Sequence, residues 1–209
     1  MRRQSLLLLL VLLAAAKPAT AESLDGRLGI TAKAGALVPL KDDFVSSTTH
    51  SNPGVAAGGG IIFGLGRNFA GEIDVTHVPG LDVEISGAKA YEARLTDVSL
   101  GVQYRFLPAE HLVPYVGGGV DFITGELKHV SGADYDLEWT EGGHVNLGFD
   151  YFLTPGIAFT GEARGIFPFD GDVTGPNGKV GTYRPMAFVG TLGFRLMLPA
   201  HVFRDTNKF

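Results

Sequence analysis

Residues 148–167 read GFDYFLTPGIAFTGEARGIF, which is two alternating runs joined by a short turn. In the first run Asp150 lies between Phe149 and Tyr151, and in the second Glu162 alternates with apolar and small residues. Alternation with period two is typical of a β-strand that has one apolar face. Thr-Pro-Gly between the runs marks a tight turn. The stretch therefore predicts an antiparallel β-hairpin.

The same alternation recurs along the chain. Such runs occupy residues 28–38, 55–65, 69–76, 97–106, 115–122, 144–151, 157–167 and 186–198. Short connections at 65–68, 107–113 and 153–156 alternate with long ones at 39–53, 79–92, 124–138 and 168–182. Regular alternation of short turns and long loops is typical of outer-membrane barrels, in which the long loops lie outside the cell. We therefore predict an all-β fold, an eight-stranded antiparallel up-and-down transmembrane β-barrel.

The charged face of each run distinguishes a membrane barrel from a soluble one. A soluble barrel carries its charges outside, whereas here the apolar stripe is nearly continuous over all eight runs, and such stripes are costly in water. We therefore expect the apolar face to contact lipid and the charged face to line the lumen. Aromatic residues near the strand ends predict two interfacial girdles. The girdle residues are Phe69, Phe106, Tyr151 and Phe152 on the turn side, and Phe122, Trp139, Phe167 and Tyr183 on the loop side.

Composition excludes several classes of protein. The chain has 209 residues, of which 30 are glycine and none is cysteine, so disulfides and thiolate chemistry are absent. Hydrophobic residues make up 45% and charged residues 19%, which is unlike a disordered chain. A net charge of −5 argues against a nucleic-acid partner.

The first residues, MRRQSLLLLLVLLAAAKPATA, have the pattern of a secretory signal peptide. Arg2 and Arg3 precede an apolar run at 6–16 that is too short to span a bilayer, and an Ala-x-Ala site ends at residue 21. An N-terminal membrane anchor is the alternative, which Lys17 and Pro18 disfavour. We expect a cleaved signal peptide at 1–21, a barrel at 22–198, a short tail at 199–209, and location in the outer membrane of a Gram-negative bacterium.

Eight strands enclose an interior just wide enough for side chains to fill. The inward positions carry a predicted lumen charge network of Lys33, Glu72, Asp74, Asp97, Arg105, Asp121, His144, Asp150, Glu162, Arg164 and Arg195. Mixed charges at this density are expected to pair, because an unpaired buried charge is costly; a polar permeation path is the alternative. Glu162 and Arg195 lie at similar distances from the turn end of the last two strands, so we predict an ion pair between them. Inward Leu37, Ile62, Ile123, Phe152 and Val189 predict an apolar constriction.

Three segments carry a family resemblance. PYVGGGVDF at 114–122, the hairpin at 148–167 and RPMAFVGTLGFRL at 184–196 resemble OmpW-type and OmpA-type small outer-membrane barrels. Thr191, Gly193, Leu196 and Leu198 resemble the signal that the barrel-assembly machinery reads. The resemblance implies a passive channel for small apolar or amphipathic molecules. The alternative is a non-transporting, envelope-stabilising barrel whose loops bind partners or lipopolysaccharide.

A third class, a lipid A-modifying enzyme, has weaker support. His129-Val130-Ser131 with Glu138 and Glu141 resembles PagL-type lipid A deacylases, but Gly132 replaces the asparagine of that family. We therefore predict no catalytic residues.

Binding sites for small groups are also not expected. Asp134 with Asp136 and Asp170 with Asp172 offer too few oxygen ligands for a calcium loop, so we predict no metal site and no cofactor. Acidic residues outnumber lysines in the long connections, so divalent cations are expected to bridge them to lipopolysaccharide phosphates. Outer-membrane lipids are the remaining expected partner, and a monomer is favoured.

Overall fold

A computed structural model describes residues 24–40, 50–108, 110–175 and 178–198. The expected signal peptide, the tail and part of the first long connection lie outside these residues. The strands, in chain order, are β1 (Leu28–Pro39), β2 (His50–Ser51), β3 (Gly54–Gly64), β4 (Phe69–Ile85), β5 (Ala88–Arg105), β6 (Leu112–His129), β7 (Asp134–Thr154), β8 (Ile157–Pro168), β9 (Gly171–Gly175), β10 (Gly178–Tyr183) and β11 (Ala187–Met197).

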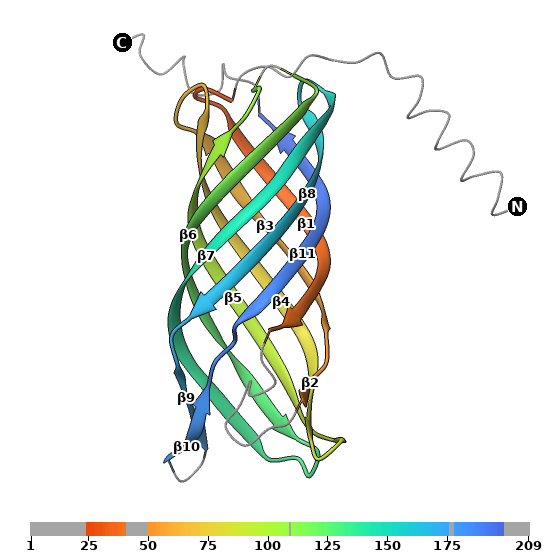
Figure 1. Ribbon diagram of the computed structural model, residues 1–209, viewed down its shortest axis with the longest axis vertical. Coiled ribbons are helices and arrows are strands. Elements are labelled where there is room, and N and C mark those ends of the chain that lie inside the picture. Colours follow the sequence, from red (N-terminus) through yellow and green to blue (C-terminus); the bar gives the residue numbers. More distant parts are fainter. Residues whose placement is uncertain (1–23, 41–49, 109, 176–177, 199–209) are drawn as a thin grey trace, which may run out of the picture.

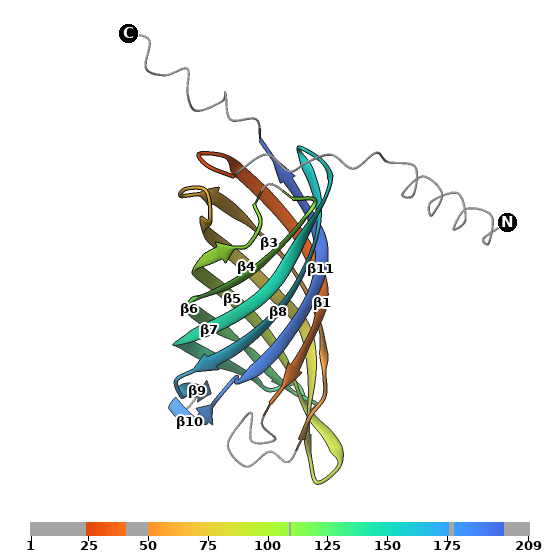
Figure 2. The ribbon, with the colours of Figure 1, turned by 45° about the horizontal axis from the view of Figure 1, so that its top comes forward.

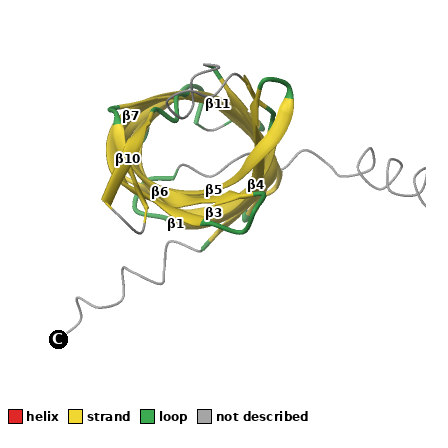
Figure 3. Ribbon diagram, turned by 90° about the horizontal axis from the view of Figure 1, so that it is seen from below, coloured by secondary structure: helices red, strands yellow, loops and turns green. Residues whose placement is uncertain are grey.

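Eight of these strands close into a ring, which Figure 3 shows end-on. Each pairs antiparallel with its neighbours in the order β3, β1, β11, β8, β7, β6, β5, β4 and back to β3. The prediction of an all-β, eight-stranded antiparallel barrel is confirmed. Among the described residues no helix is long and apolar enough to cross a membrane.

The strands differ in length on opposite sides of the ring. β4, β5, β6 and β7 have 17 to 21 residues, whereas β1, β3, β8 and β11 have 11 or 12. The long strands continue past the ends of the short ones, where β2 pairs with β4, and β9 with β7. We call this continuation, together with β2, β9 and β10, the outer extension; Figures 1 and 2 show it at the end opposite the short turns.

The outer extension corrects the prediction that residues 79–92, 124–138 and 168–182 are loops. β4 and β5 are joined by only Ser86 and Gly87, which have φ of 52° and 79° as a type I′ hairpin turn requires. A β-bulge between Val78 and Leu81 shifts the phase of the period-two pattern in β4, after which the pattern resumes with Leu81 and Val83 inward. The pattern is hard to see in the sequence because the bulges change its phase and because the outward face of these segments is charged rather than apolar.

The outer surface of the ring carries an apolar band. Its exposed side chains include Ile30, Ile61, Ile73, Val102, Leu147, Leu192 and Phe194. Phe69, Phe106 and Tyr151 near the short turns, and Trp139 and Phe167 at the other margin, are exposed as the girdle prediction requires. Phe152 and Tyr183 are buried, so their girdle assignment is wrong. Phe152 faces the lumen, and Tyr183 turns inward because its hydroxyl donates to the carbonyl of Glu138.

Candidate functional site

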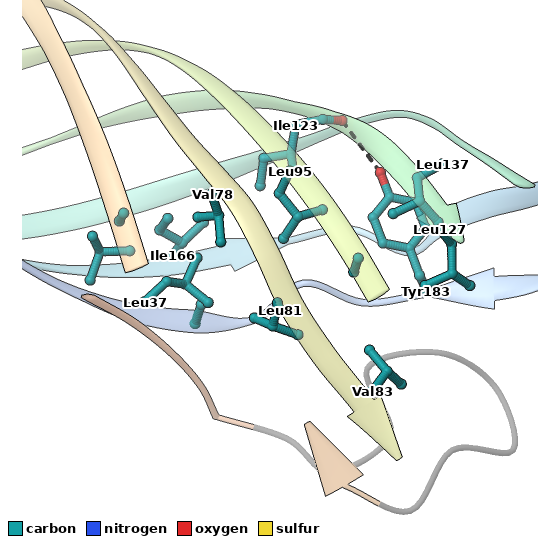
Figure 4. Close-up of a cluster of buried hydrophobic side chains, with 14 of the residues drawn as sticks. Leu37, Val78, Leu81, Val83, Leu95, Ile123, Leu127, Leu137, Ile166 and Tyr183 are labelled. Atoms are coloured by element: carbon teal, nitrogen blue, oxygen red, sulfur yellow. Dashed lines mark hydrogen bonds between the residues drawn. The ribbon is translucent and has the colours of Figure 1, made fainter. Parts of the chain in front are cut away.

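The lumen is filled by three layers of side chains. At the short-turn end, Ile62, Phe152 and Met197 belong to a small apolar cluster. The middle layer is the polar network described below. Beyond it a larger apolar cluster, here called the outer cluster, fills the lumen and continues into the outer extension. Its members include Leu37, Val78, Leu81, Val83, Leu95, Ile123, Leu127, Leu137, Ile166, Val189 and Tyr183, most of which Figure 4 labels.

The polar network begins with a carboxylate shared by two arginines. Nη2 of Arg105 and Nη1 of Arg195 each lie 2.5 Å from Oδ2 of Asp150. Asp150 is fully buried, and Arg105 and Arg195 are 1% and 3% exposed. Both guanidinium groups also lie over the ring of Tyr115, at 5.6 and 5.9 Å from its centroid. The group is buried on all sides, so its charges depend on each other rather than on water.

A second group of charges lies towards the outer cluster. The amino group of Lys33 is 3.1 Å from Asp74 and from Glu162, and Nη2 of Arg164 is 3.1 Å from the same two carboxylates. Glu162 also accepts hydrogen bonds from Tyr115 and Asn146. Two cations and two anions therefore alternate across the lumen, in contact with side chains from both sides of the ring.

Three further acidic residues of the lumen have no lysine or arginine nitrogen within hydrogen-bond distance. Glu72 accepts from the amides of Gln103 and Asn146 at 2.6 and 3.1 Å. Asp121 lies 2.8 Å from Nδ1 of His144. Asp97 is 3.9 Å from Nη1 of Arg164, which donates to Ser99 Oγ at 2.7 Å instead.

The structure places all eleven residues of the expected charge network in the lumen, but not in the expected pairs. The predicted ion pair between Glu162 and Arg195 is wrong. Glu162 lies opposite Thr191, and Arg195 opposite Ala158, so they are four residues apart in register. Turn length alone did not fix this register. Gln103 and Asn146 were not included because they are neutral, although their inward position in the alternation was a sufficient signal.

A cavity lies where the polar network meets the outer cluster. Its volume is about 20 Å³, room for one or two water molecules. Lys33, Asp97 and Arg164 line its polar side. Leu95 and Val189 are on its apolar side. Of the five inward apolar residues expected to form a constriction, Leu37, Ile123 and Val189 lie beside this cavity, and Ile62 and Phe152 lie at the short-turn end.

The other expected sites lie outside the lumen network. His129 Nδ1 is 2.6 Å from Ser131 Oγ, in the exposed turn between β6 and β7. Ser131 also donates its backbone N–H to the same nitrogen at 3.1 Å, so the contact closes the turn. Among the described residues no group of three or more His, Asp or Glu side chains is arranged to hold a metal ion.

The residues that resemble an assembly signal lie on the last strand or directly after it. Thr191 is inward, Gly193 is opposite Lys33 of β1, and Leu196 is exposed on the apolar band. Leu198 follows the strand, and its N–H donates to the carbonyl of Leu28.

The outer extension carries ion pairs on its exposed surface. Lys89 lies 2.6 Å from Asp82 and 3.1 Å from Glu92, and hydrogen bonds to these carboxylates raise the pKa of its amino group. Asp170 pairs with Arg184 near the start of β9. Surface pairs of this kind orient side chains but contribute little free energy.

Comparisons with known proteins agree with this architecture. A family model described as outer membrane protein beta-barrel domain matches residues 6–195. OprG from Pseudomonas aeruginosa is 16% identical, with a TM-score of 0.65 over 85% of this chain and 98% of its own. Neisserial surface protein A is 17% identical, with a TM-score of 0.59 over 82% and 97%. AlkL is 19% identical, with a TM-score of 0.56 over 87% and 95%. A search of curated proteins finds no match.

Proposed function

Because the chain belongs to the family of outer membrane protein β-barrel domains, we propose that it is a sealed, envelope-stabilising barrel whose working surface is the outer extension. The observation that carries this proposal is the three-layered lumen. Apolar clusters lie on both sides of the network, and inward polar side chains such as Lys33, Asp97 and Asp150 are at most 8% exposed. A hydrated pore requires inward positions that face bulk water.

Ion conductance tests the proposal. We expect the refolded protein to give no conductance steps in planar lipid bilayers. Replacement of Arg105, Asp150 and Arg195 together by alanine removes the shared carboxylate with both of its arginines and opens the middle layer, so this variant should conduct. Regular conductance steps from the unaltered protein would contradict a sealed lumen.

Orientation follows from the same proposal. We place the short turns in the periplasm of a Gram-negative bacterium and the outer extension outside, after export by a signal peptide at residues 1–21. Protease applied to intact cells should cut the hairpin tips at 86–87 and 130–133, and leave the turns at 65–68 and 153–156 intact. Sequencing of the mature N-terminus should start at Glu22. Cleavage of the short turns instead would invert the topology.

Lipopolysaccharide is the partner that we propose for the base of the outer extension. A groove on its outward face is lined by Arg94, Glu126, Asp136 and Trp139, directly beyond the apolar band. This is the level of the headgroup phosphates, and a divalent cation there bridges acidic side chains to phosphate. The purified protein should retain more lipopolysaccharide in Mg²⁺ than in a chelator, and Asp136→Asn should reduce that difference. Equal retention in both buffers would contradict the proposal.

A passive route for small apolar or amphipathic molecules is the second candidate. The observation that favours it is the position of the outer cluster, which makes the outer half of the lumen apolar. Cells that express the protein should then take up the dye N-phenylnaphthylamine faster than cells without it, although no ions pass. Equal uptake rates would leave only the sealed barrel.

A further inference from the structure

The groove at the base of the outer extension is shaped by a β-bulge between β6 and β7. Across this pair of strands the single residue Thr124 faces two residues, Glu138 and Trp139. Successive residues of a regular strand point to opposite faces, but here both are exposed, and Trp139 is 62% exposed. The bulge therefore turns the ring of Trp139 to the outer surface, where it forms part of the groove lining.

Side-chain hydrogen bonds hold the backbone of the bulge. The hydroxyl of Thr124 donates to the carbonyl of Leu137 at 3.1 Å. The hydroxyl of Tyr183 donates to the carbonyl of Glu138 at 2.6 Å. These bonds fix the backbone on the N-terminal side of Trp139, so the position of its ring does not depend on a ligand.

Most of the remaining groove lining is polar. His77, Thr96 and Thr124 lie opposite one another on β4, β5 and β6, and His77 Nδ1 is 3.0 Å from Thr96 Oγ1. Two residues away along β5 and β6, Arg94 and Glu126 also lie opposite each other in the same groove. A guanidinium donates, a carboxylate accepts and a hydroxyl does both, so the lining matches a ligand with several hydroxyl groups.

Size and charge narrow the class of ligand. The groove has a volume of about 580 Å³, which is within the range of small-ligand sites. Its lining includes the carboxylates of Glu126, Asp136 and Glu138 against the guanidinium of Arg94. An anionic group therefore needs a bridging cation there, whereas a neutral ligand does not. A pyranose ring is neutral, has hydroxyls at its edge, and has C–H groups on its faces that stack on the negative face of an aromatic ring.

We propose that this groove binds a neutral sugar ring of the surrounding lipopolysaccharide. The ring stacks on Trp139, and its hydroxyls accept from Arg94 and donate to Glu126. The groove opens directly beyond the apolar band, at the height of the sugars of that lipid. This contact rests on the orientation and the lipid partner proposed above, but it needs neither phosphate nor a divalent cation.

Fluorescence tests the contact directly, because Trp139 is the only tryptophan of the chain. The full barrel in lipid nanodiscs without lipopolysaccharide is titrated, in EDTA, with core oligosaccharide from which the phosphates have been removed. We expect a saturable change in Trp139 emission, and no change with sorbitol, which has hydroxyls but no ring. Cellotriose, a soluble neutral glycan, should bind more weakly. An absent response, or an equal response to sorbitol, would overturn sugar stacking, and equal binding of cellotriose would overturn lipopolysaccharide as the source.

Variants separate stacking from general adsorption, with saturation-transfer NMR of the oligosaccharide as the readout. Trp139→Ala should weaken binding at least tenfold, and Trp139→Phe, which keeps an aromatic face, should recover most of it. Glu126→Ala should weaken binding about fivefold, the effect of one lost hydrogen bond. Phe167→Ala is the matched control, because it removes an exposed aromatic ring at the same margin but outside the groove. Unchanged binding by Trp139→Ala, or equal losses by Trp139→Ala and Phe167→Ala, would contradict the site.

The sugar contact and the phosphate bridge fail in different ways. A response of Trp139 in EDTA supports the sugar contact even if Mg²⁺ has no effect on lipopolysaccharide retention, in which case only the bridge is wrong. Retention that depends on Mg²⁺, without a response of Trp139 to the oligosaccharide, would overturn the sugar contact alone.

Discussion

The middle of the lumen and the outer extension both contain ion pairs between strands, but in opposite surroundings. In the lumen, Asp150 and its two arginines are at most 4% exposed as side chains. In the extension, the side chains of Lys128 and Asp134 are 56% and 73% exposed at a separation of 3.7 Å. Buried charges lose their hydration and depend on their partners, whereas exposed charges keep water as an alternative partner. Ion pairs of the same kind are therefore needed for stability in the lumen and contribute little to stability in the outer extension.

Asp150→Ala should have the largest effect, because it leaves two buried arginines without their carboxylate. We expect a loss of about 3–5 kcal/mol in the free energy of unfolding. Urea titration of folding in lipid vesicles measures it. A loss below about 1 kcal/mol would mean that water reaches the middle layer, and the contrast between the two regions would disappear.

Leu192→Arg tests the outer surface of the same part of the barrel. Leu192 is exposed on β11 within the apolar band, so an arginine there should cost about 2–4 kcal/mol if it lies near the bilayer midplane. Val180→Arg is the matched control, because Val180 is equally exposed on β10 in the outer extension. Similar free-energy costs for Leu192→Arg and Val180→Arg would contradict a membrane boundary between these two positions.

Glu162→Gln should have an intermediate effect of about 1.5–3 kcal/mol, because Asp74 still links Lys33 and Arg164. A double-mutant cycle sharpens the result. Glu162→Gln should couple to Lys33→Met and be additive with Arg195→Met. Coupling between Glu162 and Arg195 would instead support the ion pair expected from the sequence, and would contradict the register in which Glu162 lies opposite Thr191.

Asp134→Ala should have the smallest effect, within about 0.5 kcal/mol. The same vesicle titration applies, at low and high salt, and what change there is should shrink as salt rises. A loss comparable to that of Asp150→Ala would show that burial does not govern these pairs.

The sequence predicts most of the barrel and less of its interior. The two-residue alternation of side chains gives the strand number and the inward face, and the succession of short and long connections gives the antiparallel order. It places Glu162 and Arg195 inside but cannot pair them, because pairing depends on register and on how far each side chain reaches across the ring. Arg195 reaches Asp150 on β7, two strands away, and no local pattern records such a contact.

The outer extension was missed for a related reason. Its inward residues Leu81, Val83 and Leu127 keep the strand pattern, but its outward residues are the charged ones of a surface exposed to water. The apolar outward stripes therefore end at the membrane boundary, although the strands continue beyond it. The cavity was also unpredictable, because it results from unfilled volume rather than from any residue type.

The strand lengths also have a consequence for the order of folding. β1 and β11, which join the two ends of the ring, are among the short strands, and their hydrogen-bonded side chains Thr31 and Arg195 are 164 residues apart in the chain. The strands of the hairpins β4–β5 and β6–β7 are instead neighbours in the chain, joined only by residues 86–87 and 130–133. Such local contacts form fastest, because little chain entropy is lost in closing them. We therefore expect ring closure between β1 and β11 to be the last and slowest event, in which the hairpin tips take no part. A circular permutant that opens the chain at Gly87 and links the present ends should convert this slow closure into a local step.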